Sequence, residues 1–390
     1  MPPVRSKTTL PVLFSIIVID LIGFAIIIPV LPFYADAYGA DGLVLGLLFT
    51  CHAAMQAVFA PRWGRLADRI GRRPVMLVTI AGTGASLLIL GFADSLAMLF
   101  IARIFSGIFA ANISVATAYI ADVTEEEERT RWMGMVGACF GVGFILGAGI
   151  GGPLALYGFG VPMFVAAGLA AANLVHAFFV LKEPATHQSS AEERQVSVRA
   201  LANPTVRNLC LTYFLFTVAV TQLEVVFAFF MKDTFGYDVA QVAWVLVGMA
   251  VLMAVIQGGA IRRLVERYGE KPLMLVGMSL MAVSFFAMPW PATVGLLLIP
   301  LAGVAVGRAV SQPSMLGMVS FEATAANRGA VMGTFQSSAS LARVLGPLGA
   351  GALYDWQHRA PFWLAAALLV IALGTAIPLQ APRAAVSAAE

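Results

Sequence analysis

The stretch Leu10–Val30, LPVLFSIIVIDLIGFAIIIPV, decides the fold of this chain. A transmembrane helix needs about 20 mostly apolar residues, whereas the apolar core of a signal peptide spans about 7–15. We therefore expect a permanent membrane span. Asp20 lies near its middle, where a carboxylate costs on the order of 3 kcal/mol to insert. A carboxylate at that depth indicates a proton carrier or a cation site.

The composition of the whole chain agrees with that interpretation. It is 60% hydrophobic and 12% charged, whereas soluble proteins are about 25% charged. The sequence therefore predicts an integral membrane protein. Twelve stretches have the length and hydropathy of a span: 10–31, 42–61, 75–93, 96–120, 131–153, 161–181, 207–231, 240–260, 273–290, 293–318, 329–353 and 362–380.

The basic residues predict the orientation. Of 24 Lys and Arg, three lie within the predicted spans, two lie in loops of one side, and the others lie in loops and tails of the opposite side. Basic loops stay in the cytoplasm, so we expect both termini and the long middle loop there. The net charge of +3 then serves orientation, and no nucleic-acid partner is expected.

The second half of the sequence repeats the first. Arg69–Pro74 corresponds to Arg267–Pro272, and Leu146–Gly147 corresponds to Leu345–Gly346, with offsets of 198 and 199 residues. Parallel repeats are one way in which transporters are built. We predict an all-α membrane protein with twelve transmembrane helices in two six-helix bundles. The predicted parts are the first bundle 1–184, a cytoplasmic linker 185–204, the second bundle 205–383 and a tail 384–390.

Enzyme chemistry is not indicated. The chain has no phosphate-binding GxxxxGK[ST] loop, no nucleophile elbow and no metal-ligand spacing. Cys51, Cys139 and Cys210 fall in apolar spans without CxxC spacing, so we interpret them as small buried residues. We expect no catalytic residue, no metal and no cofactor.

Several motifs carry a family resemblance that extends over the chain. GRLADRIGRR at 64–73 resembles the loop signature of major facilitator transporters. Asp20–Phe24 with Pro29–Pro32 resembles the first-span signature of twelve-span drug:proton antiporters, which include the tetracycline exporters. Arg103 with Gly107 resembles the intramembrane arginine motif. The run Gly143–Gly152 resembles the antiporter signature of the fifth span.

The chain also departs from these patterns. Ala148 stands where the fifth-span signature has proline. Tetracycline exporters carry acids in their third and ninth spans, and the stretches 75–93 and 273–290 carry none. The resemblance therefore implies an exporter of this kind without implying tetracycline as its substrate.

The resemblance implies a latch that joins the two halves on the cytoplasmic side. Asp68 would meet the start of the span 329–353, and Arg72 would pair with Asp122. The alternative is a basic anchor without a switching role. The residues assigned to the latch are Gly64, Asp68, Arg69, Gly71, Arg72, Arg73 and Asp122.

Charges within the spans mark the expected coupling site. They fall on spans that line the central cavity of family members, which suits their cost in lipid. We assign proton coupling to Asp20, Arg103 and Glu224. For Asp20 the alternatives are a static pair with Arg103 or direct binding of a cation. For Glu224 the alternative is a fixed ion pair, with Arg343 as the expected partner.

Polar side chains on the same spans are expected to line the substrate cavity. His52 and Gln56 lie one turn apart on one helix face; His52 either relays protons or is a hydrogen-bonded packing residue. The expected cavity residues are His52, Gln56, Asn112, Glu224, Arg308, Gln312, Gln336 and Arg343. Glycines that let helices approach closely, either to seal an interface or simply to pack, are Gly143, Gly147, Gly151, Gly152 and Gly346.

Together these features predict a secondary transporter that exchanges protons for a lipophilic or cationic compound by alternating access, with the proton gradient as its energy source. The alternative is a proton-coupled transporter of an endogenous metabolite, with Arg308 or Arg343 holding the substrate if it is anionic. A third class, a transporter-like scaffold or sensor, requires that the cavity charges be dispensable. By resemblance the protein is a monomer of the bacterial inner membrane, with protons, lipid and a small lipophilic substrate as its partners.

Overall fold

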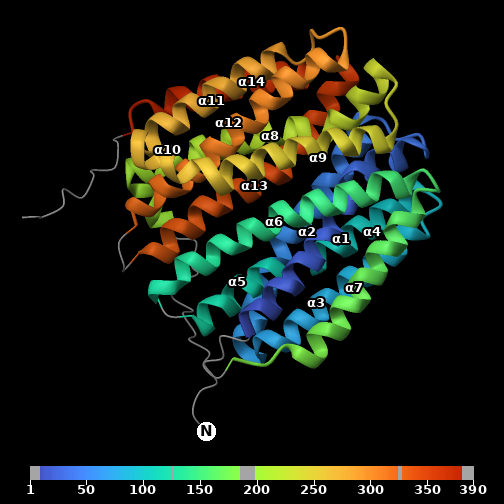
Figure 1. Ribbon diagram of the computed structural model, residues 1–390, viewed down its shortest axis with the longest axis vertical. Coiled ribbons are helices and arrows are strands. Elements are labelled where there is room, and N and C mark those ends of the chain that lie inside the picture. The colour runs from blue at the N-terminus through green and yellow to red at the C-terminus, as the bar shows by residue number, and fades with distance from the viewer. Residues whose placement is uncertain (1–8, 125, 185–197, 324–326, 380–390) are drawn as a thin grey trace, which may run out of the picture. The chain divides into compact units, whose positions relative to one another are not determined.

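The computed structural model describes residues 9–124, 126–184, 198–323 and 327–379, and their regular secondary structure is helical (Figure 1). This confirms the predicted all-α class. In chain order the elements are α1 Thr9–Asp36, α2 Gly42–Ile70, α3 Arg72–Gly91, α4 Leu96–Phe109, α5 Asn112–Val123, α6 Glu126–Ala155, α7 Gly160–Val180, the 3₁₀ turn η1 Val198–Ala202, α8 Pro204–Phe235, α9 Val239–Val255, the π-helical turn η2 Ile256–Ala260, α10 Ile261–Tyr268, α11 Glu270–Ala287, α12 Val294–Phe321, α13 Arg328–Trp356 and α14 Ala360–Ala376.

In the described residues, 10 helical segments are long and apolar enough to cross a membrane. They coincide with the first ten predicted spans. The last two, 329–353 and 362–380, lie on α13, which carries Arg343 and several serines, and on α14, which has 17 residues. The chain is a multi-span membrane protein, and the count of twelve spans and the cytoplasmic position of the termini stay predictions.

One predicted span, 96–120, is interrupted. Helix α4 ends at Phe109, Ala110 leaves the helical conformation with ψ 56°, and α5 begins at Asn112. Such a break frees backbone carbonyls that lipid cannot satisfy. Two side chains of α2 satisfy them here: Trp63 Nε1 donates to the Ile108 carbonyl at 2.6 Å, and Gln56 Nε2 donates to the Ala110 carbonyl at 3.0 Å.

The residue contacts divide the chain into two compact units, Met1–Ser189 with Val225–Val251 and Ser190–Glu224 with Leu252–Glu390. The boundary passes through α8 and α9, whose segment 225–251 belongs to the first unit. The predicted domain limits stay a prediction. Most of the predicted linker, 185–197, and the predicted tail 384–390 lie outside the described residues.

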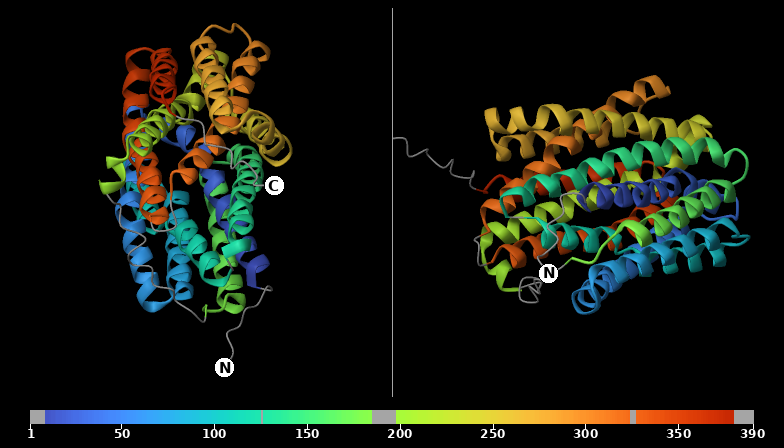
Figure 2. Two further views of the ribbon diagram at one scale, coloured as in Figure 1. Left: turned by 90° about the vertical axis from the view of Figure 1, so that its left-hand side faces the viewer. Right: turned by 60° about the horizontal axis from the view of Figure 1, so that its bottom comes forward.

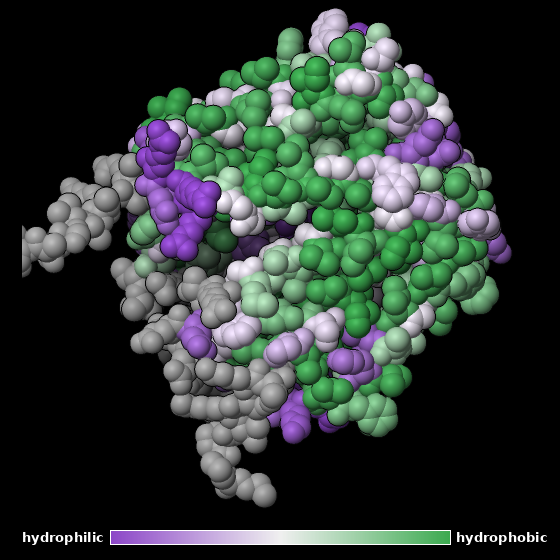
Figure 3. Space-filling view, viewed as in Figure 1, coloured by the Kyte–Doolittle hydropathy of each residue, from purple (hydrophilic) through white to green (hydrophobic). Residues whose placement is uncertain are grey.

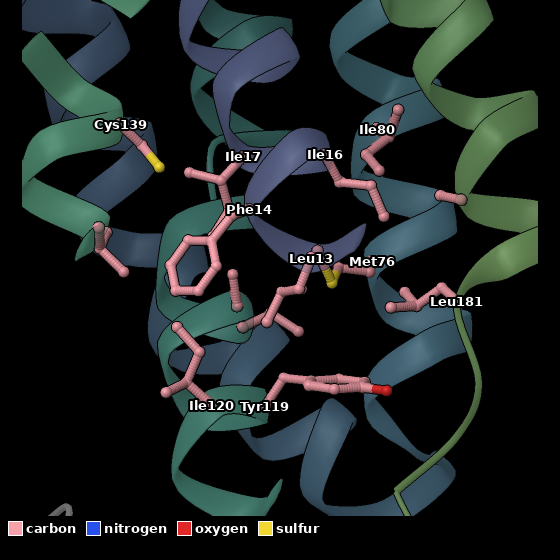
Figure 4. Packing of buried hydrophobic residues seen from close by; sticks show 14 of the residues in the cluster. Leu13, Phe14, Ile16, Ile17, Met76, Ile80, Tyr119, Ile120, Cys139 and Leu181 are labelled. Carbon is pink, nitrogen blue, oxygen red and sulfur yellow. The ribbon is translucent and has the colours of Figure 1, made fainter. Parts of the chain in front are cut away.

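Helix α1 is central in the first unit, where it packs against α6, α7 and α5; its long contact with α6 can be followed in Figure 2. The hydrophobic core gathers around the first half of α1. Leu13 and Ile16 are fully buried there, and they pack with Met76 of α3 and Tyr119 of α5 (Figure 4). Because this core fixes α1, it also fixes the height at which Asp20 lies.

The predicted glycines set the distance between α6 and α1. A Cβ added at Gly143 would lie 2.5 Å from Leu21 Cβ, one at Gly147 would lie 2.5 Å from the Ile22 carbonyl oxygen, and one at Gly151 would lie 2.6 Å from the Ile26 carbonyl oxygen. Real Cβ atoms do not approach other atoms so closely. Gly152 faces a different neighbour, Ala243 of α9, within the same unit.

Some contacts within the first unit have an equivalent contact within the second unit. In the first unit Arg73 Nη2 donates to the Phe178 carbonyl, and in the second Lys271 Nζ donates to the Ile377 carbonyl. These residues are related by offsets of 198 and 199, which are those of the sequence repeat. The glycines follow the same rule: Gly147 packs on Ile22, and Gly346 packs on Thr221, 199 residues later in both cases.

The flanks of the helices are apolar where they meet their surroundings. Val276, Val283 and Phe286 of α11 are exposed, as is Phe179 of α7. On the face seen in Figure 3 the sides of the helices are hydrophobic, and hydrophilic residues gather over α10, whose sequence IRRLVERY carries four charges. Such an apolar flank suits contact with lipid chains.

Replacing Gly147 by alanine should lower the thermal unfolding temperature of the detergent-solubilised protein. Alanine gains about 1 kcal/mol over glycine in a helix interior, but overpacking costs about 1–3 kcal/mol, and here the added Cβ meets the α1 backbone. Gly137→Ala on the same helix is the matched control, since nothing lies within 4 Å of its added Cβ. Equal unfolding temperatures for the two variants would contradict the close α1–α6 packing.

Candidate functional site

Asp20 of α1 is held by Asn112 of α5. Asn112 Nδ2 donates to Asp20 Oδ1 at 2.6 Å, and Asn112 is buried, with 7% of its surface exposed. A hydrogen bond to a charged group contributes about 1.5–3 kcal/mol. Asn112 is the first residue of α5, whose N-cap Ala111 offers no capping side chain. The carboxylate therefore lies beside a helix N-terminus, where the helix dipole favours negative charge.

The interrupted span is responsible for this geometry. If α4 continued without a break, residue 112 would lie in a helix interior, with no N-terminus at the level of Asp20. Transporters of other architectures use interrupted helices in the same way, with half-helix N-termini directed at anionic groups. The sequence assigned Asn112 to the substrate cavity, and the structure brings it to the expected proton site instead.

His52 and Gln56 lie on one face of α2, as predicted, and both are bonded to the interrupted span. His52 Nδ1 lies 2.8 Å from Ser106 Oγ, and the imidazole lies 6.4 Å from the Phe24 ring, measured between ring centroids. Gln56 donates to the Ala110 carbonyl. For His52 this is the geometry of the hydrogen-bonded packing residue that was its alternative.

The alternative of a static Asp20–Arg103 pair is wrong. Arg103 is buried, its Nε donates to the Leu48 carbonyl at 3.5 Å, and its guanidinium lies 5.6 Å from the Phe49 ring centroid. Both partners belong to α2. Arg103 precedes Asn112 by nine residues, roughly 13 Å along a helix, so the arginine and the carboxylate lie at different depths.

The expected Glu224–Arg343 pair is also wrong. Glu224 Oε1 accepts from Arg308 Nη1 at 2.8 Å, between α8 and α12 of the second unit. The side chains are 46% and 31% exposed, so solvent screening keeps their attraction modest. Arg343 is exposed on α13, and no ion pair joins it to an acid in the described part of the chain. Glu224 and Arg343 were paired because their predicted depths in the membrane are similar, but depth does not determine which helices are neighbours.

The other two expected cavity residues lie in the second unit. Gln312 is half-buried on α12, one turn after Arg308, and Gln336 is exposed on α13. That these side chains line a substrate cavity stays a prediction.

The loop signature between α2 and α3 forms the ion pair that the resemblance implied. Arg72 Nε lies 2.9 Å from Asp122 Oδ2 at the end of α5, which confirms the predicted pair, and Arg72 Nη1 lies 2.5 Å from Asp68 Oδ1. Arg73 donates to the Phe178 carbonyl and lies over the Phe178 ring. Gly64 is buried and Arg69 is exposed. Contact of Asp68 with the span 329–353 stays a prediction.

Sequence reasoning missed Glu183, which caps α3. Its Oε1 accepts from the Arg72 amide at 2.6 Å and its Oε2 accepts from the Arg73 amide at 2.9 Å. Gly71 has a φ of 107° and lies so close that a Cβ there would be 2.7 Å from the Glu183 carboxyl carbon. The glycine of the signature thus provides both the turn and the space for a carboxylate from beyond the end of α7.

A second missed pair joins Asp36, the last residue of α1, to Lys232 of α8, both within the first unit. A sequence signal existed, because Lys232 is one of only two basic residues in the loops assigned to the non-cytoplasmic side.

In the described residues, no group of three or more His, Cys, Asp or Glu could hold a metal ion. Cys51, Cys139 and Cys210 are free thiols.

Comparison with known proteins identifies the family. The family model described as Major Facilitator Superfamily matches residues 13–262 and 209–389. The chain is 34% identical to the class D tetracycline resistance protein of Salmonella ordonez, over 85% of this chain and 86% of the relative. It is 28% identical to multidrug resistance protein 2 of Bacillus subtilis (strain 168), over 95% of this chain and 94% of the relative.

Solved structures agree on the fold. A bacterial homologue of the human lysosomal transporter Spinster, in an inward-facing and occupied conformation, has a TM-score of 0.79 at 15% identity, over 96% of this chain and 97% of that one. The human organic anion transporter MFSD10 has a TM-score of 0.72 at 24% identity, over 96% of this chain and 100% of that one. At these identities the likeness concerns the fold alone.

Replacing Glu183 by alanine should destabilise the protein by about 1 kcal/mol, the usual effect of removing a helix N-cap acceptor. The measurement is thermal unfolding of the purified protein in detergent. Lys182→Ala is the control, because the Lys182 side chain is exposed and only its carbonyl is bonded, to Tyr119. If both variants unfold at the wild-type temperature, Glu183 does not stabilise α3.

Proposed function

The chain belongs to the major facilitator superfamily, and on this premise we propose that it is a proton-coupled exporter of lipophilic or cationic drug-like compounds. It works by alternating access. Protons move inward down their gradient, and the compound moves outward. The protein acts as a transporter, with no bound cofactor, as a monomer in the bacterial inner membrane.

The observation that carries this proposal is the Asp20–Asn112 contact. Asp20 lies near the middle of the first predicted span, in a helix whose other charged residue, Asp36, is its last. An ionisable group at such a depth is a functional residue by default, because its insertion is costly. Its bonding by a neutral amide, rather than by an arginine, leaves the site free to change its charge.

Proton exchange follows from this arrangement. The ionised carboxylate is stabilised by the Asn112 amide and by the positive end of α5. When the cavity opens outward, water delivers a proton to Asp20, and the neutral acid tolerates desolvation. When the cavity opens inward, an arriving lipophilic cation favours the ionised carboxylate, and the proton leaves to cytoplasmic water. Arg103 lies nine residues before Asn112, more than two helical turns away, and modulates this exchange through its charge.

The substrate class rests on the relatives and on the site. Several relatives are named for resistance to tetracycline and others for multidrug resistance. Helix α3 contains no acid. The acid of α11 is Glu270, its first residue, which lies before the predicted span 273–290. The proposal therefore names lipophilic and cationic compounds as a class and does not single out tetracycline.

The second candidate is an anionic metabolite bound by arginine. It is supported by Arg343, which is exposed and has no acidic partner among the described residues. Arg308 supports it less, because Glu224 already balances its charge at 2.8 Å. In this candidate Arg343 is the residue that recognises the anion.

The decisive test is proton release from detergent-purified protein when tetraphenylphosphonium, a lipophilic cation, is added in weakly buffered solution. Wild-type protein should release protons as the cation binds, and Asp20→Asn should not, because the amide has no proton to exchange in this range. Asp41→Asn is the matched control: Asp41 is a carboxylate that caps α2, accepting from the Val44 amide at 2.8 Å, and its variant should release protons as wild type does.

Two results would overturn the proposal in different ways. Persistent release in Asp20→Asn would move the coupling carboxylate elsewhere, with Glu224 tested next. No response to any lipophilic compound, together with binding of an anionic metabolite that Arg343→Gln abolishes, would replace drug export by the second candidate.

A further inference from the structure

We propose that Asn112 is the positioning residue of the proton site, bonding Asp20 in both of its protonation states. The inference rests on the proposed function, because only a transporter that exchanges protons needs such a site. The contacts of the first unit are the observations that support it. It moves Asn112 from the substrate cavity, where the sequence put it, to the proton site.

The first step is the placement of the amide. Asn112 is buried, and its Nδ2 reaches Asp20 Oδ1 at 2.6 Å. It begins α5 directly after the break at Ala110 and Ala111, and the break is held by the hydrogen bond from Gln56 to the Ala110 carbonyl. The Asn112 side chain therefore belongs to a backbone segment that is held by its hydrogen bond to α2. This bond helps to fix the position of the amide relative to α1.

The second step is the chemistry of a primary amide. Its NH₂ group donates and its oxygen accepts. Toward an ionised carboxylate the NH₂ group is the matching partner, and toward a protonated carboxyl the oxygen is. In the described chain Asn112 Oδ1 is buried and has no hydrogen-bond partner. A half-turn of the amide about its last bond presents this oxygen to the acid, so one side chain serves both states.

The proton balance is simple. One proton from water bonds to a carboxylate oxygen of Asp20 in the loading step, and the same O–H bond breaks in the release step. Asn112 neither gains nor loses a proton. The donor bond to the ionised state is charge-assisted and stronger than the neutral bond to the acid. The amide therefore favours the ionised state on balance while keeping Asp20 in one place.

Other ionisable groups of the helices packed on α1 have partners of their own. On α5 Tyr119 donates to the Lys182 carbonyl and Asp122 pairs with Arg72, and on α7 His176 contacts Ser15. The charged residues of α6 lie in its first turns, at least 12 residues before Gly143, about 18 Å along the helix, and Cys139 of α6 lies in the hydrophobic core. On α2 and α4, His52 is bonded to Ser106 and Arg103 to the Leu48 carbonyl.

The chain contains a matched control for the amide. Asn173 of α7 is fully buried, and its Nδ2 also donates to α1, at the Ile16 carbonyl, 3.0 Å away. Ile16 precedes Asp20 by one helical turn. Like Asn112, Asn173 has a buried Oδ1 without a partner in the described chain. The two asparagines differ chiefly in what they bond: a carbonyl that cannot titrate, or a carboxylate that can.

The experiment is an infrared titration of the purified full-length protein, without any drug. The carbonyl band of the protonated Asp20 carboxyl is identified by its loss in Asp20→Asn and followed with pH. In Asn112→Leu the titration midpoint should move upward by about one pH unit, because the lost charge-assisted bond is the stronger of the two. In Asn112→Gln, which keeps the donor and the acceptor of the amide, the titration midpoint should lie close to that of wild type. Asn173→Leu should leave the midpoint unchanged.

The outcomes separate the inference from the function on which it rests. An unchanged midpoint in Asn112→Leu, or an equal shift in Asn173→Leu, overturns the role of Asn112 whatever the protein transports. If Asn112→Leu does not fold, Asn112→Ala is titrated in its place with the same expectation. A wild-type protein whose Asp20 titrates with the expected Asn112 dependence, yet releases no proton to any compound, keeps the inference and loses the proposed function. Absence of a titrating Asp20 band overturns both.

Discussion

Polar groups at membrane depth must find their partners within the protein, and this constraint organises the first unit. The break between α4 and α5 frees carbonyls that Trp63 and Gln56 satisfy from α2. Because those bonds make the break tolerable, α5 can begin inside the unit, and its first residue can meet Asp20. The site thus depends on two side chains that bond the backbone of the interrupted span and not the carboxylate itself.

The same constraint explains why the charged groups are separated. Arg103 is turned toward α2, where a backbone carbonyl and an aromatic ring solvate it. Had it paired with Asp20, breaking that pair in a transport cycle would leave a buried charge uncompensated, which is strongly unfavourable. A neutral amide avoids that barrier. Where acids of the described chain do pair with arginine, the pair lies elsewhere: Arg72 with Asp122 at the end of α5, and Arg308 with Glu224 in the second unit.

Much of the helical fold could be predicted from the sequence, because long apolar stretches and a repeated pattern of anchors are local signals. The break at Ala110 and Ala111 could not, since neither proline nor glycine marks it. Contacts between helices were predicted correctly where the family resemblance implied both partners, as for Arg72 and Asp122. The predicted contact of Arg343 with Glu224 was wrong, because depth along a span does not determine which helices are neighbours or how each is rotated. Glu183 lies 111 residues from the amide of Arg72 that it caps, beyond the reach of any local pattern.

The glycine contact of α6 with α1 has a consequence for hydration. Where Gly143, Gly147 and Gly151 meet the α1 backbone, the two helices are so close that neither a lipid chain nor a water molecule fits between them. The contacted stripe of α1 runs along Leu21, Ile22 and Ile26, and Asp20 is rotated away from it by about 100° or more. The seam is therefore dry, and no water reaches the carboxylate between α1 and α6. Under the proposed function, the glycines of α6 thus close one face of α1 to protons.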